Sequence, residues 1–113
     1  MKFSEIKTHL SKFSVGIAGA GGLGSNCAVS LARSGVGTLV IADFDIVEEA
    51  NLNRQYYFYD QIGRKKAPAL KENILKINPF CKVEAYDIFV DKTNIPDLFH
   101  RRAVECFNYY IAS

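Results

Sequence analysis

Apolar residues recur at helical spacing at the start of the chain and then give way to a short, almost uninterrupted apolar run. One stripe of the predicted first helix contains the apolar residues Phe3, Ile6, Leu10 and Phe13. The run over 14–19 lacks the alternation of polar and apolar residues, which is typical of a central parallel strand covered on both faces. The pattern therefore predicts a short helix followed by a buried strand.

The same succession of strands and amphipathic helices continues along the chain. A helix is predicted over 25–35, with Leu23, Cys27 and Leu31 on one side, Ala28 and Ala32 beside them, and Gly35 as its C-terminal cap. The remaining predicted elements are a strand over 38–43, a long loop over 51–63, a helix from 66 to 78 with Pro68 in its first turn, a strand over 82–87, a short helix over 94–101 and a strand over 103–107.

This order of elements predicts the α/β class, with a Rossmann-like parallel sheet, right-handed crossovers and helices on both faces. Ligands of such sheets bind at the carboxyl ends of the strands, where we expect Gly19, Asp43 and Phe107 to lie. The 113 residues, 49% of them hydrophobic, suffice for one core. They are few for a complete doubly wound enzyme, so we expect 1–113 to be a single, incomplete nucleotide-binding domain.

Charge and cysteine content exclude several classes of partner. The net charge of +2 is spread along the chain and gives no reason to expect nucleic acid or a membrane surface. No apolar run approaches the roughly twenty residues that span a bilayer. Three scattered cysteines, Cys27, Cys81 and Cys106, form no zinc-binding pairs and fit the reducing cytoplasm.

The glycine-rich sequence GAGGLG at 19–24 follows a predicted strand and opens a predicted helix. Glycine there allows a sharp turn and close approach of the backbone to a phosphate, and the helix N-terminus directs N–H groups at an anion. Asp43 ends the next strand, where a carboxylate can accept hydrogen bonds from ribose hydroxyls. The context predicts nucleotide binding, but it does not separate NAD from ATP.

Five short motifs in order, GAGGLG, GVG, DFD, NLNRQ and GRKKA, are shared with one family. Together they resemble the ThiF/MoeB/HesA family and the related ubiquitin-activating enzymes, and within it the compact ThiF-type proteins of thiamin biosynthesis. The resemblance implies the N-terminal nucleotide-binding half of a ThiF-type fold. It also implies ATP-dependent adenylation, with Mg²⁺, of the C-terminal glycine carboxylate of a small ubiquitin-like sulfur carrier protein (ThiS-like), with release of pyrophosphate.

The resemblance also implies roles for individual residues. Arg54 and Lys66 are the expected catalytic residues, which hold the phosphates. The expected nucleotide-binding residues are Gly19, Gly21, Gly22, Gly24, Asp43, Asp45, Asn51, Asn53 and Gln55. For Asn51 and Gln55, the alternative is that they only orient the loop. The family usually has Ser at position 50, where this chain has Ala50.

A physical argument favours ATP over NAD. A carboxylate that attacks the α-phosphorus of ATP is an anion approaching a polyanion, so adenylation needs fixed positive charge. Arg54 offers a planar fork for two phosphate oxygens, and Lys66 a compact charge. A lysine in the first turn of a helix is disfavoured by the helix dipole, which suggests an anion beside it.

Two segments leave alternatives open. The aromatic run at 55–59 is expected either to form a homodimer face or to pack on the chain's own sheet. Asn108 stands where the family has a magnesium-binding Asp, and an amide is a poorer ligand for that cation. One alternative function is therefore a truncated, non-catalytic module for nucleotide binding or dimerisation. Another is a relative that acts on a modified tRNA base.

Overall fold

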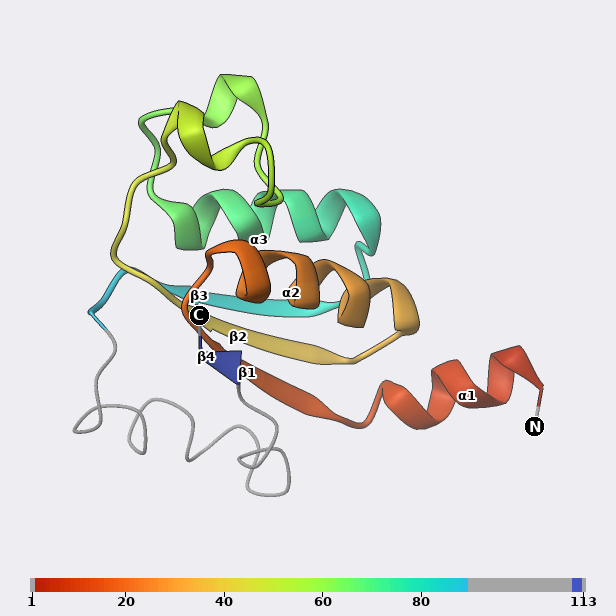
Figure 1. The fold of residues 1–113 in the computed structure, drawn as a ribbon. Helices are drawn as coiled ribbons and strands as arrows, with labels where there is room; N and C mark the ends of the chain where they lie inside the picture. The colour runs from red at the N-terminus through yellow and green to blue at the C-terminus, as the bar shows by residue number, and fades with distance from the viewer. Residues whose placement is uncertain (1, 90–110, 113) are drawn as a thin grey trace.

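The computed structural model describes residues 2–89 and 111–112, in which four strands form one parallel sheet in the order β3-β2-β1-β4 (Figure 1). The strands are β1 (Ser14–Ala18), β2 (Thr38–Ala42), β3 (Lys82–Tyr86) and β4 (Ile111–Ala112). The helices are α1 (Phe3–Leu10), α2 (Gly22–Ser34) and α3 (Lys66–Ile77), with the 3₁₀ turns η1 (Glu49–Asn51) and η2 (Tyr59–Gln61). Parallel α/β architecture is confirmed.

Three strands end level with one another. Ala18 of β1 lies opposite Ala42 of β2, which in turn lies opposite Tyr86 of β3. Backbone bonds continue this level edge, because the Gly19 N–H donates to the Ala42 carbonyl at 2.8 Å and the Asp43 N–H to the Tyr86 carbonyl at 3.1 Å. The segments that directly follow β1 and β2 in the chain therefore begin side by side at the carboxyl edge of the sheet.

Helices α2 and α3 both cover one face of the sheet (Figure 1). Successive right-handed crossovers that step in one direction, from β1 to β2 to β3, place their helices on the same face. The buried core lies between the sheet and these helices; it includes Ile17, Leu39 and Ile41 of the strands and Leu70 and Ile74 of α3. The expected helix of the second face at 94–101 and the expected strand at 103–107, with Phe107, lie outside the described residues.

The buried side of α2 agrees only in part with the sequence pattern: Ala28 and Ala32 are buried as expected, but the larger apolar side chains are not. Leu23 is 61% exposed, and Cys27 and Leu31 are only half-buried. The buried residues of the helix are Gly24, Ser25, Ala28, Val29 and Ala32. Four of these five residues are small, so α2 lies close to the sheet and to α3. Hydropathy placed Leu23, Cys27 and Leu31 at the centre of the buried side, whereas Ala28 and Ala32 beside them are nearer to it.

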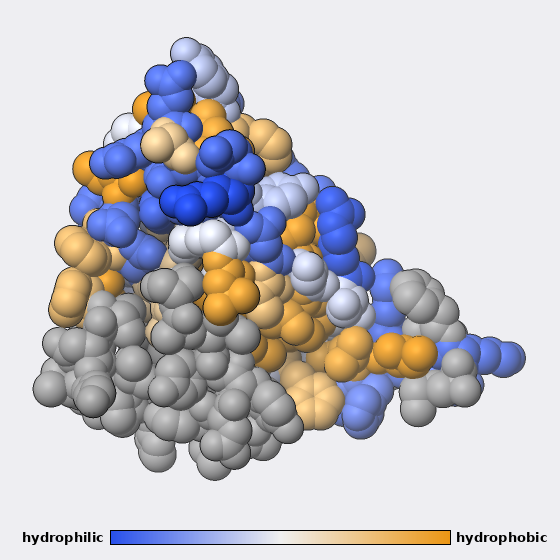
Figure 2. All heavy atoms as spheres, viewed as in Figure 1, coloured by the Kyte–Doolittle hydropathy of each residue, from blue (hydrophilic) through white to orange (hydrophobic). Residues whose placement is uncertain are grey.

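Helix α1 begins and ends near its predicted bounds, but it extends away from the sheet (Figure 1). Ile6 of its apolar stripe is 39% exposed, and Leu10 is half-buried. Apolar surface lies over this helix in Figure 2. Within 2–89 and 111–112, no helix has both the length and the apolar character that crossing a membrane requires.

Two glycines shape the connection between α2 and β2. Gly35 has a φ of +103° and caps α2 in the left-handed conformation, as the sequence predicted. Gly37 lies against the end of the α1 segment, and a Cβ added there would stand 1.9 Å from the Ser11 carbonyl oxygen. This backbone contact leaves no room for any side chain at position 37.

We expect Gly37→Ala to lower the free energy of unfolding by about 1–3 kcal/mol, because the chain must shift to relieve the overlap. Gly22→Ala is a suitable control, because the nearest atom to an added Cβ there is the Arg54 carbonyl oxygen at 3.9 Å. Urea denaturation of both variants measures the difference. Equal stability of the two variants would contradict the close approach at Gly37.

Candidate nucleotide-binding site

The glycine turn leaves β1 at Gly19 and leads directly into α2. Gly19 has a φ of +101°, a conformation that residues with a side chain rarely adopt. Helix α2 begins at Gly22, three residues earlier than the sequence pattern predicted, so Gly22 and Gly24 belong to its first turn. The N–H groups at the start of this helix therefore open at the carboxyl edge, where an anion can accept hydrogen bonds from them.

Asp43 holds the glycine turn in place. One carboxylate oxygen accepts the Ala20 N–H at 2.6 Å, and the other accepts the Asp45 N–H at 2.7 Å. Asp43 is only 9% exposed, whereas Asp45 is exposed. The acid at the end of β2 thus has a structural role that the sequence did not reveal, and the second acid of the DFD motif is the more accessible one.

The loop that contains Arg54 is fastened to the glycine turn and to α2 by three hydrogen bonds. The Asn26 amide donates to the Arg54 carbonyl at 2.8 Å, and the Tyr56 N–H donates to the Ser25 hydroxyl at 3.0 Å. The Tyr57 hydroxyl donates to the Ala20 carbonyl at 2.6 Å. We call these three bonds the loop latch.

Tyr57 is 5% exposed, and its burial, together with the charge of Asp43, raises the pKa of its hydroxyl well above the ordinary range. The hydroxyl is therefore protonated at neutral pH and acts as the hydrogen-bond donor. The aromatic run at 55–59 is divided between its two predicted environments. Tyr57 packs on its own chain and Tyr56 is half-buried, whereas Phe58 and Tyr59 are 47% and 74% exposed.

A buried pair of amides ties the same loop to α3. Gln61 and Asn73 are each 1% exposed and exchange two hydrogen bonds, of 2.7 and 2.9 Å. Asn73 also donates to the Tyr56 carbonyl at 2.9 Å, and the Gln61 oxygen accepts the Phe58 N–H at 3.0 Å. Each buried polar atom of the pair therefore has a partner, which is the condition for placing amides in a core.

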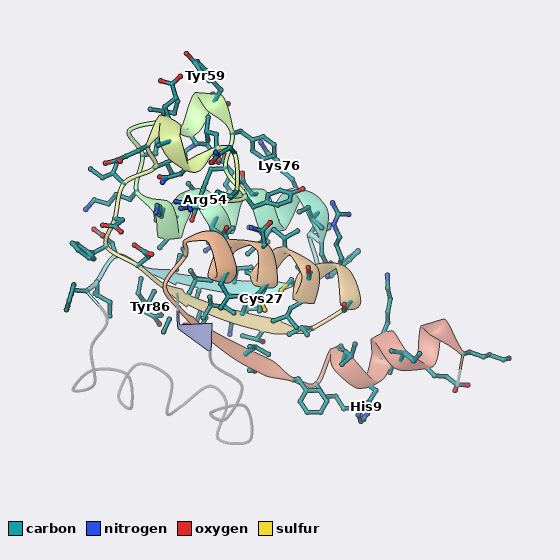
Figure 3. The ribbon with its side chains drawn as sticks, viewed as in Figure 1. His9, Cys27, Arg54, Tyr59, Lys76 and Tyr86 are labelled. Atoms are coloured by element: carbon teal, nitrogen blue, oxygen red, sulfur yellow. The ribbon has the colours of Figure 1, made fainter. Side chains whose placement is uncertain are left out.

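The two expected catalytic cations lie at the same edge of the sheet. Lys66 is the first residue of α3, and its N–H donates to the Asp45 carbonyl at 2.9 Å. Its side chain is 6% exposed and makes no ion pair or hydrogen bond with any described residue. Figure 3 shows the exposed Arg54 beside the N-terminal ends of α2 and α3, and Figure 2 shows hydrophilic surface there.

The other expected contact residues differ in their surroundings. The Asn51 side-chain oxygen accepts the Glu48 N–H at 2.8 Å, which orients the loop, and Asn53 is exposed. Gln55 is half-buried, and its side-chain oxygen is buried without a hydrogen-bond partner in the described part of the chain. Asn108 lies outside the described residues. Among those described, no cluster of three acidic, histidine or cysteine side chains could hold a metal ion.

The sequence analysis missed the residues that hold the site together: Ser25, Asn26, Tyr57, Gln61 and Asn73. Ser25, Gln61 and Asn73 are polar residues on otherwise apolar faces, which was the signal available in the sequence. Nothing in the sequence distinguished Tyr57 from its aromatic neighbours. The resulting arrangement joins a helix N-terminus, the exposed guanidinium of Arg54 and the ammonium of Lys66 at one edge, and such an arrangement can bind a polyphosphate.

Comparison with known proteins agrees with this geometry. The model of the ThiF family matches residues 3–106. The "Probable adenylyltransferase/sulfurtransferase MoeZ" of Mycobacterium tuberculosis is 42% identical over 84 residues, which are 74% of this chain and 21% of that protein. The ubiquitin-like modifier-activating enzyme 5 of Arabidopsis thaliana is 42% identical over 78 residues, 69% of this chain and 18% of that protein. The chain thus spans about a fifth of the length of these relatives.

Solved structures show the same fold. The tRNA N6-threonylcarbamoyladenosine dehydratase of E. coli, crystallised with AMP, superposes with a TM-score of 0.80 at 34% identity, over 86% of this chain and 40% of that one. The structure of the same enzyme with ATP gives the same TM-score and identity over 85% of this chain.

We expect Asn73→Ala to lower the free energy of unfolding by about 2–3 kcal/mol, because it removes two hydrogen bonds of the buried Gln61 amide and the bond to the Tyr56 carbonyl. The exposed Asn53→Ala should change stability by less than about 0.5 kcal/mol. Chemical denaturation of the two variants gives the comparison, and an Asn73→Ala protein as stable as the control would show that the amide pair contributes little.

Proposed function

Because the chain belongs to the ThiF family, we propose that it supplies the nucleotide-binding part of an ATP-dependent adenylyltransferase. In the proposed reaction, a carboxylate oxygen of the acceptor forms a bond to the α-phosphorus of ATP. The bond from that phosphorus to the bridging oxygen of pyrophosphate breaks, and an acyl-adenylate results. No proton is consumed, so the task of the protein is to align the groups and to balance negative charge.

The observation that supports this proposal best is the position of Lys66, which is 6% exposed and makes no ion pair or hydrogen bond with any described residue. A first-turn lysine also opposes the helix dipole. A phosphate bound at the start of α2 and α3 would offset this cost and give the ammonium an anionic partner. ATP therefore fits the residues present, because its phosphates supply negative charge beside Lys66.

Arg54 has the complementary role. Its exposed guanidinium can follow the phosphoryl oxygens as charge spreads over them, and its planar fork suits two oxygens at once. The Arg54 backbone is fixed to Asn26 in the first turns of α2, so its side chain starts from a defined point beside the glycine turn. Arg54 thus acts on the phosphates, and no described residue is needed as a proton acceptor.

We assign the ribose contact to Asp45 in the first place. Both oxygens of Asp43 already accept backbone N–H groups at 2.6 and 2.7 Å, and that residue is nearly buried. Asp45 is exposed two residues further on. Asp43 retains lone pairs for a second bond, and it remains a secondary candidate for the same sugar.

The acceptor that we propose is the C-terminal glycine carboxylate of a small ubiquitin-like sulfur carrier protein of the ThiS kind, in the cytoplasm. The names of the MoeZ and ubiquitin-like modifier relatives support this class of acceptor. The superposition with the E. coli tRNA dehydratase in complex with AMP and ATP favours a second candidate, a carboxylate on a modified tRNA base. Both acceptors undergo the same activation step.

Association with a second copy is proposed for the surface of η2. Phe58, Tyr59 and Ile62 are 47%, 74% and 37% exposed there. Burying these apolar side chains against a partner would remove them from water. Sedimentation equilibrium on the unaltered chain and on Tyr59→Asp would test the proposal, with a monomeric variant and a dimeric parent as the supporting result.

We expect Arg54→Ala to weaken ATP binding on the order of tenfold, the usual loss of a charge-assisted hydrogen bond, while adenosine affinity stays unchanged. In a complete enzyme the rate of adenylation should fall about a hundred- to a thousand-fold. Arg64→Ala is the matched control, because Arg64 is an exposed arginine of the neighbouring loop that pairs with Glu72 instead. Isothermal titration calorimetry measures the affinities, and an equal loss in both variants would contradict a specific role.

Carrier-dependent ATP–pyrophosphate exchange separates the enzyme from a non-catalytic module. Exchange by the 113-residue chain that Arg54→Ala abolishes supports adenylation. Tight ATP binding without any exchange supports a module for nucleotide binding. Exchange that requires a tRNA instead of a carrier protein identifies the second acceptor.

The two acids of the DFD motif should respond differently to amide substitution. We expect Asp45→Asn to weaken ATP and adenosine binding by a similar factor without loss of stability, because only a ribose contact is lost. Asp43→Asn should lower the free energy of unfolding by about 1–3 kcal/mol, since an amide cannot accept both N–H bonds equally well. Thermal denaturation and calorimetry together distinguish the roles, and a stable Asp43→Asn protein with selectively impaired adenosine binding would reverse the assignment.

A further inference from the structure

We propose that Tyr57 is a positioning residue of this site, whose hydroxyl orients the glycine turn toward the phosphates and couples that turn to the loop of Arg54. The effect of Tyr57 on ATP binding rests on the proposed nucleotide-binding function. The hydrogen bond that holds the glycine turn does not, because it is present in the chain without nucleotide.

The first observation is that both backbone groups of Ala20 are held by buried side chains. The Ala20 N–H donates to Asp43, and the Ala20 carbonyl accepts from the Tyr57 hydroxyl, each at 2.6 Å. Ala20 itself has no exposed surface. The end of β2 and the loop after η1 are both distant from Ala20 in the sequence, and they hold this residue of the glycine turn from two sides.

This arrangement sets the direction of the next peptide N–H. In a trans peptide the carbonyl of one residue and the N–H of the next point in opposite directions. The described part of the chain contains no cis peptide bond. With the Ala20 carbonyl directed to Tyr57, the Gly21 N–H is directed to the opposite side of the turn. The Tyr57 bond therefore restrains the rotation of this peptide plane, which the backbone conformation of a glycine at 21 restrains only weakly.

The second observation is that the same bond belongs to the loop latch. Tyr57 lies three residues after Arg54, and the bonds from Asn26 to Arg54 and from Tyr56 to Ser25 fasten the segment between them to α2. A rotation of the turn would therefore be passed on to the arginine loop. The loop latch thus keeps the glycine turn and the loop of Arg54 in one relative position.

The third observation concerns the chemistry of the hydroxyl. Burial and the nearby Asp43 charge keep the pKa of Tyr57 far above neutrality, so the group stays a donor. The ring of a phenylalanine would fill the same space. Only a fixed donor to Ala20 requires tyrosine here, so the hydroxyl can be tested separately from the packing of the ring.

The test compares Tyr57→Phe with Tyr56→Phe in the full chain. Tyr56 is the matched control, because it is the neighbouring tyrosine and its hydroxyl makes no hydrogen bond to any described residue. Amide hydrogen exchange is followed first, without nucleotide. We expect exchange at Ala20 and Gly21 and over 54–57 to accelerate on the order of tenfold in Tyr57→Phe, while core amides such as those of Leu39 stay unchanged. Uniform acceleration throughout the chain, or none, would overturn the proposal.

Ligand binding gives the second readout. Tyr57→Phe should weaken the binding of ATP about five- to tenfold and the binding of adenosine less than about twofold. General destabilisation of the fold would not produce this selectivity. Tyr56→Phe should match the unaltered chain for both ligands. Equal weakening of ATP and adenosine would count against positioning. If neither the unaltered chain nor any variant binds ATP, the proposed function is wrong. The hydrogen-exchange result still decides whether Tyr57 orients the glycine turn.

A third measurement requires no substitution and covers the case of a variant that does not fold. In the unaltered chain, the ring carbon that bears the Tyr57 hydroxyl should show no NMR titration as the pH approaches the ordinary tyrosine pKa of about 10, whereas a free tyrosine derivative in the same buffer titrates there. A Tyr57 signal that titrates together with that of the free derivative would show that its hydroxyl is not held in the interior.

Discussion

The peptide groups of Ala20, held between Asp43 and Tyr57, are the constraint on which the candidate site depends. A glycine turn is flexible by composition, and its N–H groups can serve a phosphate only if their direction is fixed. Here the fixing comes from two buried side chains with bonds of 2.6 Å. The turn is therefore ordered by its neighbours and not by its own residues, which explains why a run of glycines can still form a precise corner.

Order of this kind spreads through the loop to α3. The Gln61 and Asn73 amides satisfy one another in the interior and hold the Tyr56 carbonyl, one residue before the Tyr57 bond. Each member would be unfavourable alone, and together they leave no polar atom of the pair unsatisfied. Lys66 is the contrasting case, because the described chain gives its ammonium no ion-pair partner. The Gln61–Asn73 pair uses its polar atoms internally, whereas Lys66 keeps its charge available to a ligand.

The sequence predicted the framework better than the connections. Apolar runs located β1 and β2, and Gly35 marked the end of α2, because burial and backbone conformation each leave a direct mark on residue type. Leu23 was wrongly placed on the buried side because close packing of helices favours small side chains, which carry little hydropathy. Tyr57 could not be singled out, because the partner of its hydroxyl is a backbone carbonyl 37 positions away. Bonds from side chains to distant backbone groups leave no pattern in residue spacing.

The strand order adds a reason for the placement of the turn. Strand β1 has β2 on one side and β4 on the other, so the chain reverses its direction of growth there, and open α/β sheets bind ligands at such a point. The groups assigned to the nucleotide, Asp45, Arg54 and Lys66, all follow β2 in the chain. In the proposed reaction, the attacking and leaving oxygens at the α-phosphorus lie roughly in line. If Arg54 and Lys66 hold the phosphates at this edge, the acceptor carboxylate would have to reach the α-phosphorus from the side opposite the departing pyrophosphate.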